Sequence, residues 1–276
     1  NVVATDVGGT SFDVGLVIDG ALPGASRPRI DRHGLAVPVI DLGSIGTGGG
    51  SIAYVDPALG VLRVGPQSAG SRPGPACYGL GGTQPTVTDA AAILGYLDRL
   101  GGSLTLDVAA ARSAMEPLAA ALGLDVHAAA DGVLRVASAQ MADLVRRCSV
   151  QRGQDPRKFV LYAYGGAAPQ HVGRYAADLG VRSIVIPRLG PQFSAWGAAS
   201  GDMRSFWEVE FPARRFRDHA GGLEETFAGL ERQALAEFGE VPRAAGRTVL
   251  KRSVGLKFTR QLHRINVPVG GGQLTA

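Results

Sequence analysis

The sequence predicts an α/β fold, and the region after residue 150 indicates it most clearly. An apolar run at 158–164 is typical of a buried strand and ends on two glycines. A short helix is expected from there to about residue 179, followed by a strand at 183–186 and a helix of small residues at 193–200. Strand–helix–strand–helix alternation predicts a sheet with helices packed on it and ligands at the carboxyl ends of its strands.

The first ninety residues are rich in strand and turn patterns. Residues 1–60 are expected to form strands and turns. Residues 61–90 are expected to be mainly loops, because proline and glycine interrupt them too often for helices. A helix is predicted over 89–97, with Thr88 or Asp89 as its N-cap.

Two longer helices are predicted next. One covers 107–122, with Asp107 as its cap, and the other covers 128–150. The apolar face of the second is formed by Val133, Val136, Met141, Leu144 and Val145. Arg146 and Arg147 lie near its end, where cations interact favourably with the helix dipole.

The character of the chain changes after about residue 203. Residues 208–211 are expected to form an exposed strand, 223–238 an amphipathic helix and 250–269 further strands. We therefore predict two domains, at 1–203 and 204–276, with the second an appended α+β module for domain or subunit packing.

The most informative segment is the turn between Asp6 and Asp13, which lies between apolar runs at 2–4 and 14–18. Glycines let a backbone approach a bulky anion closely, and the N–H groups of a turn form an anion-binding nest. The phosphate-binding candidates within it are Gly8, Gly9, Thr10 and Ser11. Asp6 and Asp13 are the catalytic candidates, and they are suited to hold Mg²⁺ through its waters.

The alternative interpretation of this segment is an ordinary β-hairpin, because Gly-Gly between apolar strands is a common hairpin signal. The carboxylates and hydroxyls at these spacings favour nucleotide phosphate instead. Neither a Walker A loop nor a dinucleotide-binding fingerprint is present.

Two further glycine-rich turns follow apolar segments. Gly165, Gly166 and Ala167 begin a helix, so their backbone is suited to a phosphate or a nucleoside. The alternative there is a tight strand-to-helix turn. The turn at 46–51, taken alone, indicates a flexible loop.

Composition and charge limit the classes of ligand that this chain is expected to bind. The chain has 276 residues, 19% charged and 45% hydrophobic, with a net charge of +4 from scattered arginines. Because no lysine/arginine block is present, we expect small anionic molecules or an acidic partner rather than nucleic acid. No apolar run has transmembrane length and no signal peptide is visible, so no membrane association and a cytoplasmic location are expected.

Several other residues are weaker candidates. Cys77 is expected to be the more exposed cysteine and Cys148 a packed one, both structural. Asp41 and Asp89 are secondary candidates for substrate or metal, and a helix cap is an equal interpretation of Asp89. The remaining candidates are histidines for which no catalytic role is indicated: His33, His171 and His263. No zinc site is expected.

The turn Asp6–Asp13 and the segment Tyr164–Ala167 together resemble the second phosphate loop and the adenosine loop of the actin, sugar-kinase and heat-shock ATPase superfamily. More specifically, the chain resembles the family of hydantoinase A, 5-oxoprolinase and acetone/acetophenone carboxylase. Supporting segments are 45–53, 63–70, 73–79, 85–90 and 153–157. The resemblance is strong over 1–202 and weak over 203–276, and its motifs are specific only together.

The resemblance implies a ribonuclease H-like ATPase domain that uses ATP and Mg²⁺ to phosphorylate a carbonyl substrate. In one branch of the family a ketone is then carboxylated, and in the other a cyclic amide such as hydantoin, N-methylhydantoin or 5-oxoproline is hydrolysed. It also implies a hetero-oligomer with a hydantoinase B-like subunit. Phe12, and Gln261 to His263, favour the ketone branch.

The family also has a first phosphate loop in an N-terminal domain. No second Asp-x-Gly-Gly-Thr motif occurs here, so the chain is expected to be a segment of a longer protein with half of the ATP cleft. Such a half-site is expected to bind ATP weakly and to lack independent ATPase activity. Two other functions remain open: a non-catalytic nucleotide-binding scaffold, and a sugar-kinase-like enzyme, which is disfavoured because no aspartate base accompanies a sugar-binding loop.

Overall fold

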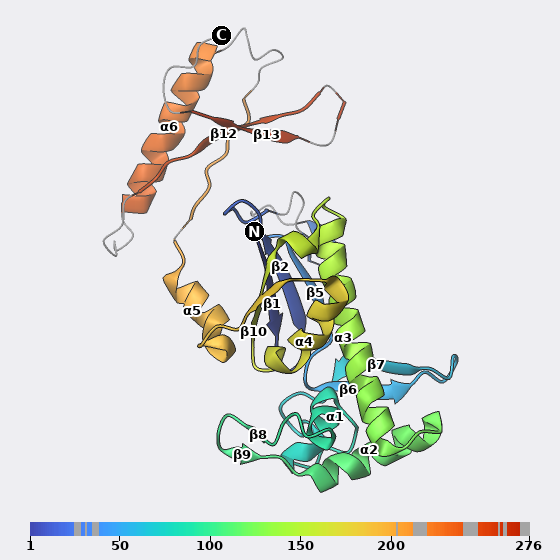
Figure 1. Cartoon of the computed structure of the whole chain (residues 1–276). Helices are drawn as coiled ribbons and strands as arrows, with labels where there is room; N and C mark the ends of the chain where they lie inside the picture. Colours follow the sequence, from blue (N-terminus) through green and yellow to red (C-terminus); the bar gives the residue numbers. More distant parts are fainter. Residues whose placement is uncertain are drawn as a thin grey trace. The chain divides into compact units, whose positions relative to one another are not determined.

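A computed structural model describes residues 1–24, 29–30, 32–34, 39–202, 204–211, 220–239, 248–258, 260–261 and 264–270 (Figure 1). The chain divides into two compact units, Asn1–Ser200 and Gly201–Ala276. The predicted strand and helix alternation after residue 150 is present in the first of them, which is therefore α/β.

A mixed sheet organises the first unit. In the described part of the unit, its strands lie in the order β11-β10-β1-β2-β5, with β11, β10 and β1 parallel and with β2 antiparallel to both β1 and β5. The bounds are β1 Val2–Val7, β2 Phe12–Val17, β5 Leu42–Ile45, β10 Val160–Tyr164 and β11 Ser183–Val185. The carboxyl ends of the three parallel strands thus meet at one edge.

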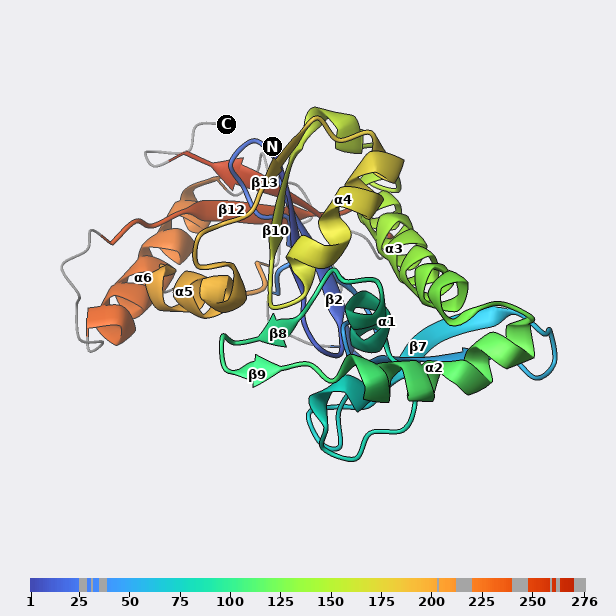
Figure 2. The ribbon, with the colours of Figure 1, turned by 60° about the horizontal axis from the view of Figure 1, so that its bottom comes forward.

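One face of this sheet carries the core. Alternate residues of β1 and β2 are buried, as expected for strands with one packed face. They pack against α3 (Val126–Val150) and α4 (Ala168–Leu179), two helices that lie against each other (Figure 2). Representative members of this core are Val3, Val7, Phe12, Met141, Val172 and Tyr175. Asp6 and Asp13 belong to the alternate set of positions, on the other face.

A second core joins the first half of α3 to α1 (Val87–Ile93), α2 (Val108–Leu122) and the hairpin of β6 (Ser51–Val55) and β7 (Leu62–Ser68) (Figure 2). The remaining short elements of the unit are β3 Arg29–Ile30, β4 His33–Gly34, β8 Arg99–Leu100, β9 Leu104–Thr105, α5 Phe193–Ser200 and 3₁₀ turns at Ala76–Tyr78, Pro156–Lys158 and Gly190–Gln192.

Helix starts follow side-chain caps. Asp107 caps α2 by accepting from the Ala110 N–H, as predicted. Asp125 caps α3, which begins at Val126, two residues before its predicted start. For α1, the predicted caps Thr88 and Asp89 are wrong. Thr86 is the N-cap, and Asp89 completes a capping box as the third helical residue.

Two other local predictions differ from the structure. The block at 61–90 was expected to be mainly loops, but it contains β7 and the start of α1, because β7 pairs with β6 across a hairpin. The exposed strand expected at 208–211 is absent from the described residues 204–211, which pair with no strand. Exposure at every position from 208 to 210 leaves no buried face to support a strand.

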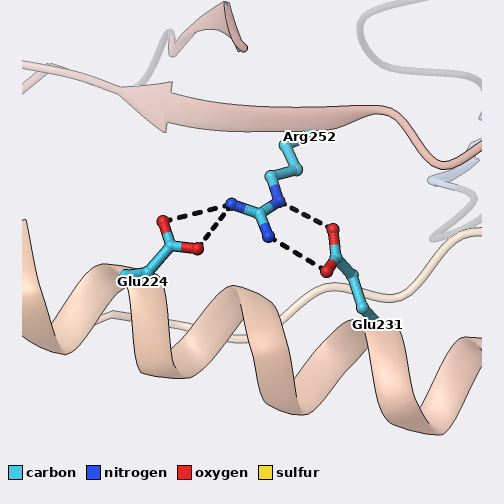
Figure 3. Close-up of polar contacts among 3 residues, drawn as sticks. All are labelled: Glu224, Glu231 and Arg252. Carbon is cyan, nitrogen blue, oxygen red and sulfur yellow. Dashed lines mark hydrogen bonds and ion pairs between the residues drawn. The ribbon is translucent and has the colours of Figure 1, made fainter. Parts of the chain in front are cut away.

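The second unit contains α6 (Ala220–Gly239) and the antiparallel pair β12 (Arg252–Leu256) and β13 (Ile265–Val269). Arg252 joins the helix to the strands (Figure 3). Its guanidinium donates to Glu231 at 2.7 and 3.0 Å and to Glu224 at 2.9 and 3.1 Å, and lies over the Phe227 ring. These hydrogen bonds, to Glu231 first, raise the pKa of Arg252.

Among the described residues, no single helix combines the length and apolar character needed to cross a membrane. The pair α2 and α3 meets that threshold only when taken together, across a bend of 86°.

Candidate functional site

The turn between Asp6 and Asp13, called the phosphate turn below for its predicted role, meets the predicted adenosine turn, Gly165–Ala167, at the edge where the parallel strands end. Asp6 on β1 lies beside Tyr164 on β10 in the parallel register. The Ala167 N–H donates to the Val7 carbonyl at 2.9 Å, and the Gly165 N–H donates to the Gly190 carbonyl at 2.9 Å. Two turns that are far apart in the sequence are therefore held side by side by backbone hydrogen bonds.

Asp6 and Asp13 stand directly opposite each other in the β1–β2 ladder. Like charges in such a position destabilise a sheet, so this pair is a local cost that a bound cation would remove. Each carboxylate accepts one hydroxyl. Asp6 accepts from Ser194 Oγ at 2.5 Å, and Asp13 accepts from Ser11 Oγ at 2.9 Å.

The turn between β1 and β2 is a hairpin turn closed by the Gly8 N–H, which donates to the Ser11 carbonyl at 3.0 Å. The hairpin alternative is thus correct as a description of the backbone. Gly9 and Thr10 are exposed at the tip of this hairpin and so are accessible to a ligand.

The glycine loop at 46–51, which taken alone indicated a flexible loop, is buried against the phosphate turn from Thr47 to Ser51. The Gly49 N–H donates to the Gly8 carbonyl at 3.0 Å, and the Gly50 N–H donates to the Gly9 carbonyl at 2.6 Å. A Cβ on Gly48 would lie 2.6 Å from the Gly8 oxygen and 2.8 Å from the Thr10 nitrogen. Glycine is required here because two backbones touch.

Gly165 is another position in this region where the structure requires glycine. Its φ is +88°, and a Cβ there would clash with the Asp6 carboxylate and the Val7 carbonyl. Its neighbours differ: Gly166 is exposed, whereas Ala167 is buried. The turn therefore places the start of α4 against the end of β1 and leaves Gly166 open.

An aromatic group lies beside the aspartates. Tyr164 packs on Phe193 with ring centroids 5.0 Å apart, and Phe193 stacks on Trp196 at 5.5 Å. Burial, and then the charges of Asp6 and Asp13, raise the pKa of Tyr164. The sequence analysis missed Ser194 and this aromatic group. The available signal was that α5 follows β11, a parallel strand whose carboxyl end lies at the edge where ligands are expected in such sheets.

The secondary aspartates have structural roles. Asp89 is fully buried and accepts from the Cys77 N–H at 2.7 Å, the Thr86 N–H at 2.9 Å and the Thr86 hydroxyl at 2.7 Å. Asp41 forms an ion pair with Arg152. Neither residue contacts the phosphate turn through these bonds.

The cysteines and histidines are also accounted for. Cys77 is buried, so its predicted exposure is wrong, while Cys148 is packed as expected. Burial, followed by the charge of Asp89, raises the pKa of Cys77, which keeps it an inert thiol. His33 is exposed and His171 is fully buried on α4. Leu262 and His263 lie outside the described residues, so the structure does not test the prediction of a family branch that was based on them.

The carboxylate pair fits Mg²⁺ better than a metal that needs an all-protein cage. The described residues contain no group of three histidine, cysteine, aspartate or glutamate side chains that could hold an ion. Mg²⁺ commonly uses one or two carboxylates together with waters and phosphate oxygens. Asp6 and Asp13 supply such carboxylates beside the predicted phosphate turn.

A cavity of about 570 Å³ lies next to this region, lined by the strands β5 to β7 and by α3. It includes Gly46 and Thr47 but none of the predicted site residues. Thr47 donates to Gln140 at 2.7 Å, and Gln140 in turn donates to the Val64 carbonyl at 3.2 Å. The cavity thus adjoins the start of the glycine loop. The residues of this loop that contact the phosphate turn, Gly49 and Gly50, follow shortly after Thr47.

Comparison with known proteins gives a consistent result. The model of the hydantoinase/oxoprolinase family matches residues 1–205. The chain is 41% identical to caprolactamase subunit alpha of Pseudomonas jessenii over 87% of its length and 34% of that protein. It is 43% identical to the acetophenone carboxylase gamma subunit of Aromatoleum aromaticum over 75% of its length and 29% of that protein.

A solved structure is similar as well. The nucleotide-free structure of acetone carboxylase, from work on ATP-dependent acetone carboxylation, matches with a TM-score of 0.78 and 30% identity. The match covers 100% of this chain and 40% of that one. The chain therefore spans about a third of the length of these curated relatives and is a fragment relative to them.

Proposed function

Because the chain belongs to the hydantoinase/oxoprolinase family, we propose that residues 1–203 are an actin-like ATPase domain forming one wall of an ATP site, with 204–276 as an appended module. The parent protein phosphorylates a carbonyl substrate. It acts with a hydantoinase B-like subunit in a hetero-oligomer, and the subunit names of the relatives support such an assembly.

One observation carries the proposal. The turn between Asp6 and Asp13 and the turn at Gly165–Ala167 meet at the edge of the mixed sheet where its parallel strands end, with the glycine loop packed against the first. A hairpin serving only as a connection would not need two opposed carboxylates or a third backbone against its tip.

The roles follow from position. Gly8, Gly9, Thr10 and Ser11 form the phosphate-binding turn. The Gly8 N–H and the Ser11 hydroxyl donate within the turn, so the open donors for the phosphates are those of the exposed Gly9 and Thr10. Gly165, Gly166 and Ala167 contact the adenosine. Asp6 and Asp13 hold Mg²⁺ through its waters, and the ion, when bound, neutralises charge on the phosphates.

The chemistry is phosphoryl transfer to oxygen. The carbonyl oxygen forms a bond to the γ-phosphorus while the bond from that phosphorus to its bridging oxygen breaks, and ADP leaves with the electron pair. The proton lost from the α-carbon of a ketone, or from the nitrogen of an amide, passes to solvent. Phosphorylation traps the reactive tautomer and turns the oxygen into a leaving group.

We place the protein in the ketone branch, where carboxylation follows, and the similarity to acetophenone carboxylase supports this choice. The similarity to a caprolactamase subunit supports the second candidate, ATP-dependent hydrolysis of a cyclic amide. The two branches share the same first step.

Phosphate release by the full-length parent protein with its partner subunit tests the proposal. The substrates are acetone, acetophenone, hydantoin, 5-oxoproline and caprolactam, each with and without bicarbonate. Release that needs a ketone and bicarbonate supports the carboxylase, and release with a cyclic amide alone supports the hydrolase.

Variants complete the test. Asp13→Ala is expected to lower the rate at least about 100-fold, because positioned charge supplies most of the catalysis in phosphoryl transfer. Asp178→Ala, an exposed aspartate on α4, is the control and should have no effect. Unchanged turnover in Asp13→Ala would contradict the proposal and favour a non-catalytic scaffold.

A further inference from the structure

A turn outside the predicted phosphate-binding segment lies against its tip. Ser68 is the last residue of β7, and its Oγ is 3.4 Å from Thr10 Oγ1. Ser68 is half-buried, whereas Thr10 and Gly70 are exposed. Two hydroxyls from different parts of the chain therefore stand side by side next to the proposed phosphate position.

Backbone hydrogen bonds fix this arrangement. The Gly50 N–H donates to the Gly9 carbonyl at 2.6 Å, and the Ala69 N–H donates to the Gly50 carbonyl at 2.9 Å. The Gly74 N–H donates to the Ala69 carbonyl at 3.2 Å from the other side. The phosphate turn, the glycine loop and the Ser68 turn thus form one connected stack, which holds Ser68 in place.

The Ser68 hydroxyl already accepts one hydrogen bond. The Gly70 N–H donates to Ser68 Oγ at 3.2 Å and so occupies one of its lone pairs. The contact to Thr10 is long for two hydroxyls, whose usual separation is about 2.7–2.8 Å. The Ser68 O–H is therefore available to an oxygen acceptor, and a donor of this kind favours one that gains negative charge.

We infer that the Ser68–Gly70 turn is the acceptor side of the site, where the Ser68 hydroxyl donates to the substrate oxygen that receives the phosphoryl group. This inference rests on the proposed function. The ligand class is a small ketone in its enol form or a cyclic amide in its imidate form. Both present an oxygen that carries negative charge as it attacks phosphorus. Thr10, one hydroxyl away, faces the phosphate.

The test uses the full-length parent protein with its partner subunit and separates nucleotide binding from use of the acceptor. ATP affinity is measured by calorimetry in the absence of acceptor, and kcat/KM for the acceptor is measured at saturating ATP. Ser68→Ala is expected to leave the ATP Kd within about twofold and to lower kcat/KM for the acceptor about 10- to 100-fold, the effect of one hydrogen bond to a charged group.

Two variants make the result specific. Ser68→Thr retains the hydroxyl and should keep kcat/KM for the acceptor within about fivefold of wild type. Ser71→Ala removes an exposed hydroxyl from the same turn region and should change neither quantity. This pair distinguishes loss of a donor from disturbance of the turn.

The possible failures are distinguishable. Ser68→Ala with unchanged acceptor kinetics overturns the inference and leaves the proposed function standing. An equal loss of ATP affinity and of acceptor kcat/KM also overturns it, because Ser68 would then hold nucleotide. A wild-type assembly that neither binds ATP nor releases phosphate with any acceptor overturns both.

Discussion

His171 is expected to make the first unit acid-labile. Its side chain is fully buried on α4, and in the described part of the chain both ring nitrogens lack a hydrogen-bonding partner. Burial, assisted by the charge of Arg174, lowers its pKa to about 4. The folded chain therefore keeps a neutral imidazole at a pH where the unfolded chain has taken up a proton.

The sign and size follow from linkage. Below the ordinary histidine pKa of about 6.5 the unfolded state binds more protons, so the free energy of unfolding falls as the pH decreases from about 6.5 to 4. Above about pH 6.5 both states carry a neutral His171, so this group no longer lowers the free energy of unfolding. With a folded-state pKa of about 4, the loss is about 2 kcal/mol at pH 5 and about 3 kcal/mol at pH 4.

Urea unfolding at pH 7.5 and pH 5.0, followed by circular dichroism, measures the effect. Other groups also titrate in this interval, so the quantity of interest is the difference between wild type and His171→Leu, which cannot take up a proton. The variant should lose about 2 kcal/mol less than wild type between the two pH values. His127→Gln, at an exposed histidine on α3, should behave as wild type.

A variant His171→Leu with the same loss of stability as wild type between pH 7.5 and 5.0 would refute the reasoning. It would mean that the imidazole finds a solvated or hydrogen-bonded position when protonated.

Two further predictions concern the site and its support. Gly165→Ala should weaken ATP binding at least about 10-fold in calorimetry, because a Cβ would push Asp6 and Val7 from their positions; Gly173→Ala on α4, where a Cβ meets nothing within 4 Å, is the matched control. Equal ATP affinity in both variants would contradict the placement of that turn. Asp89→Ala should lower the free energy of unfolding by about 2–4 kcal/mol in urea, since it leaves buried N–H groups of Cys77 and Thr86 unpaired. A fully stable Asp89→Ala variant that has lost turnover would instead make Asp89 a catalytic residue.

The sequence alone determined the α/β order of the elements and the family. Apolar periodicity located α2, α3 and β10 because their packed faces repeat in the chain, and Asp107 located the start of α2 because its cap is a local interaction. The resemblance of the turns at Asp6–Asp13 and Tyr164–Ala167 to one family, confirmed by the match over residues 1–205, depended on residue identity, which folding does not alter.

Only the tertiary structure decided which turns belong together. The glycine-rich sequence at 46–51 indicates a flexible loop when taken alone. In the structure it is packed, because Gly48 and Gly50 contact the backbone of the phosphate turn. Ser68 and Ser194 reach the site through long-range pairing of β7 and the placement of α5 after β11. Cys77 is buried for the same reason: α1 and α2 cover a segment whose own composition predicts exposure. Such contacts join residues distant in the chain, so no local pattern records them.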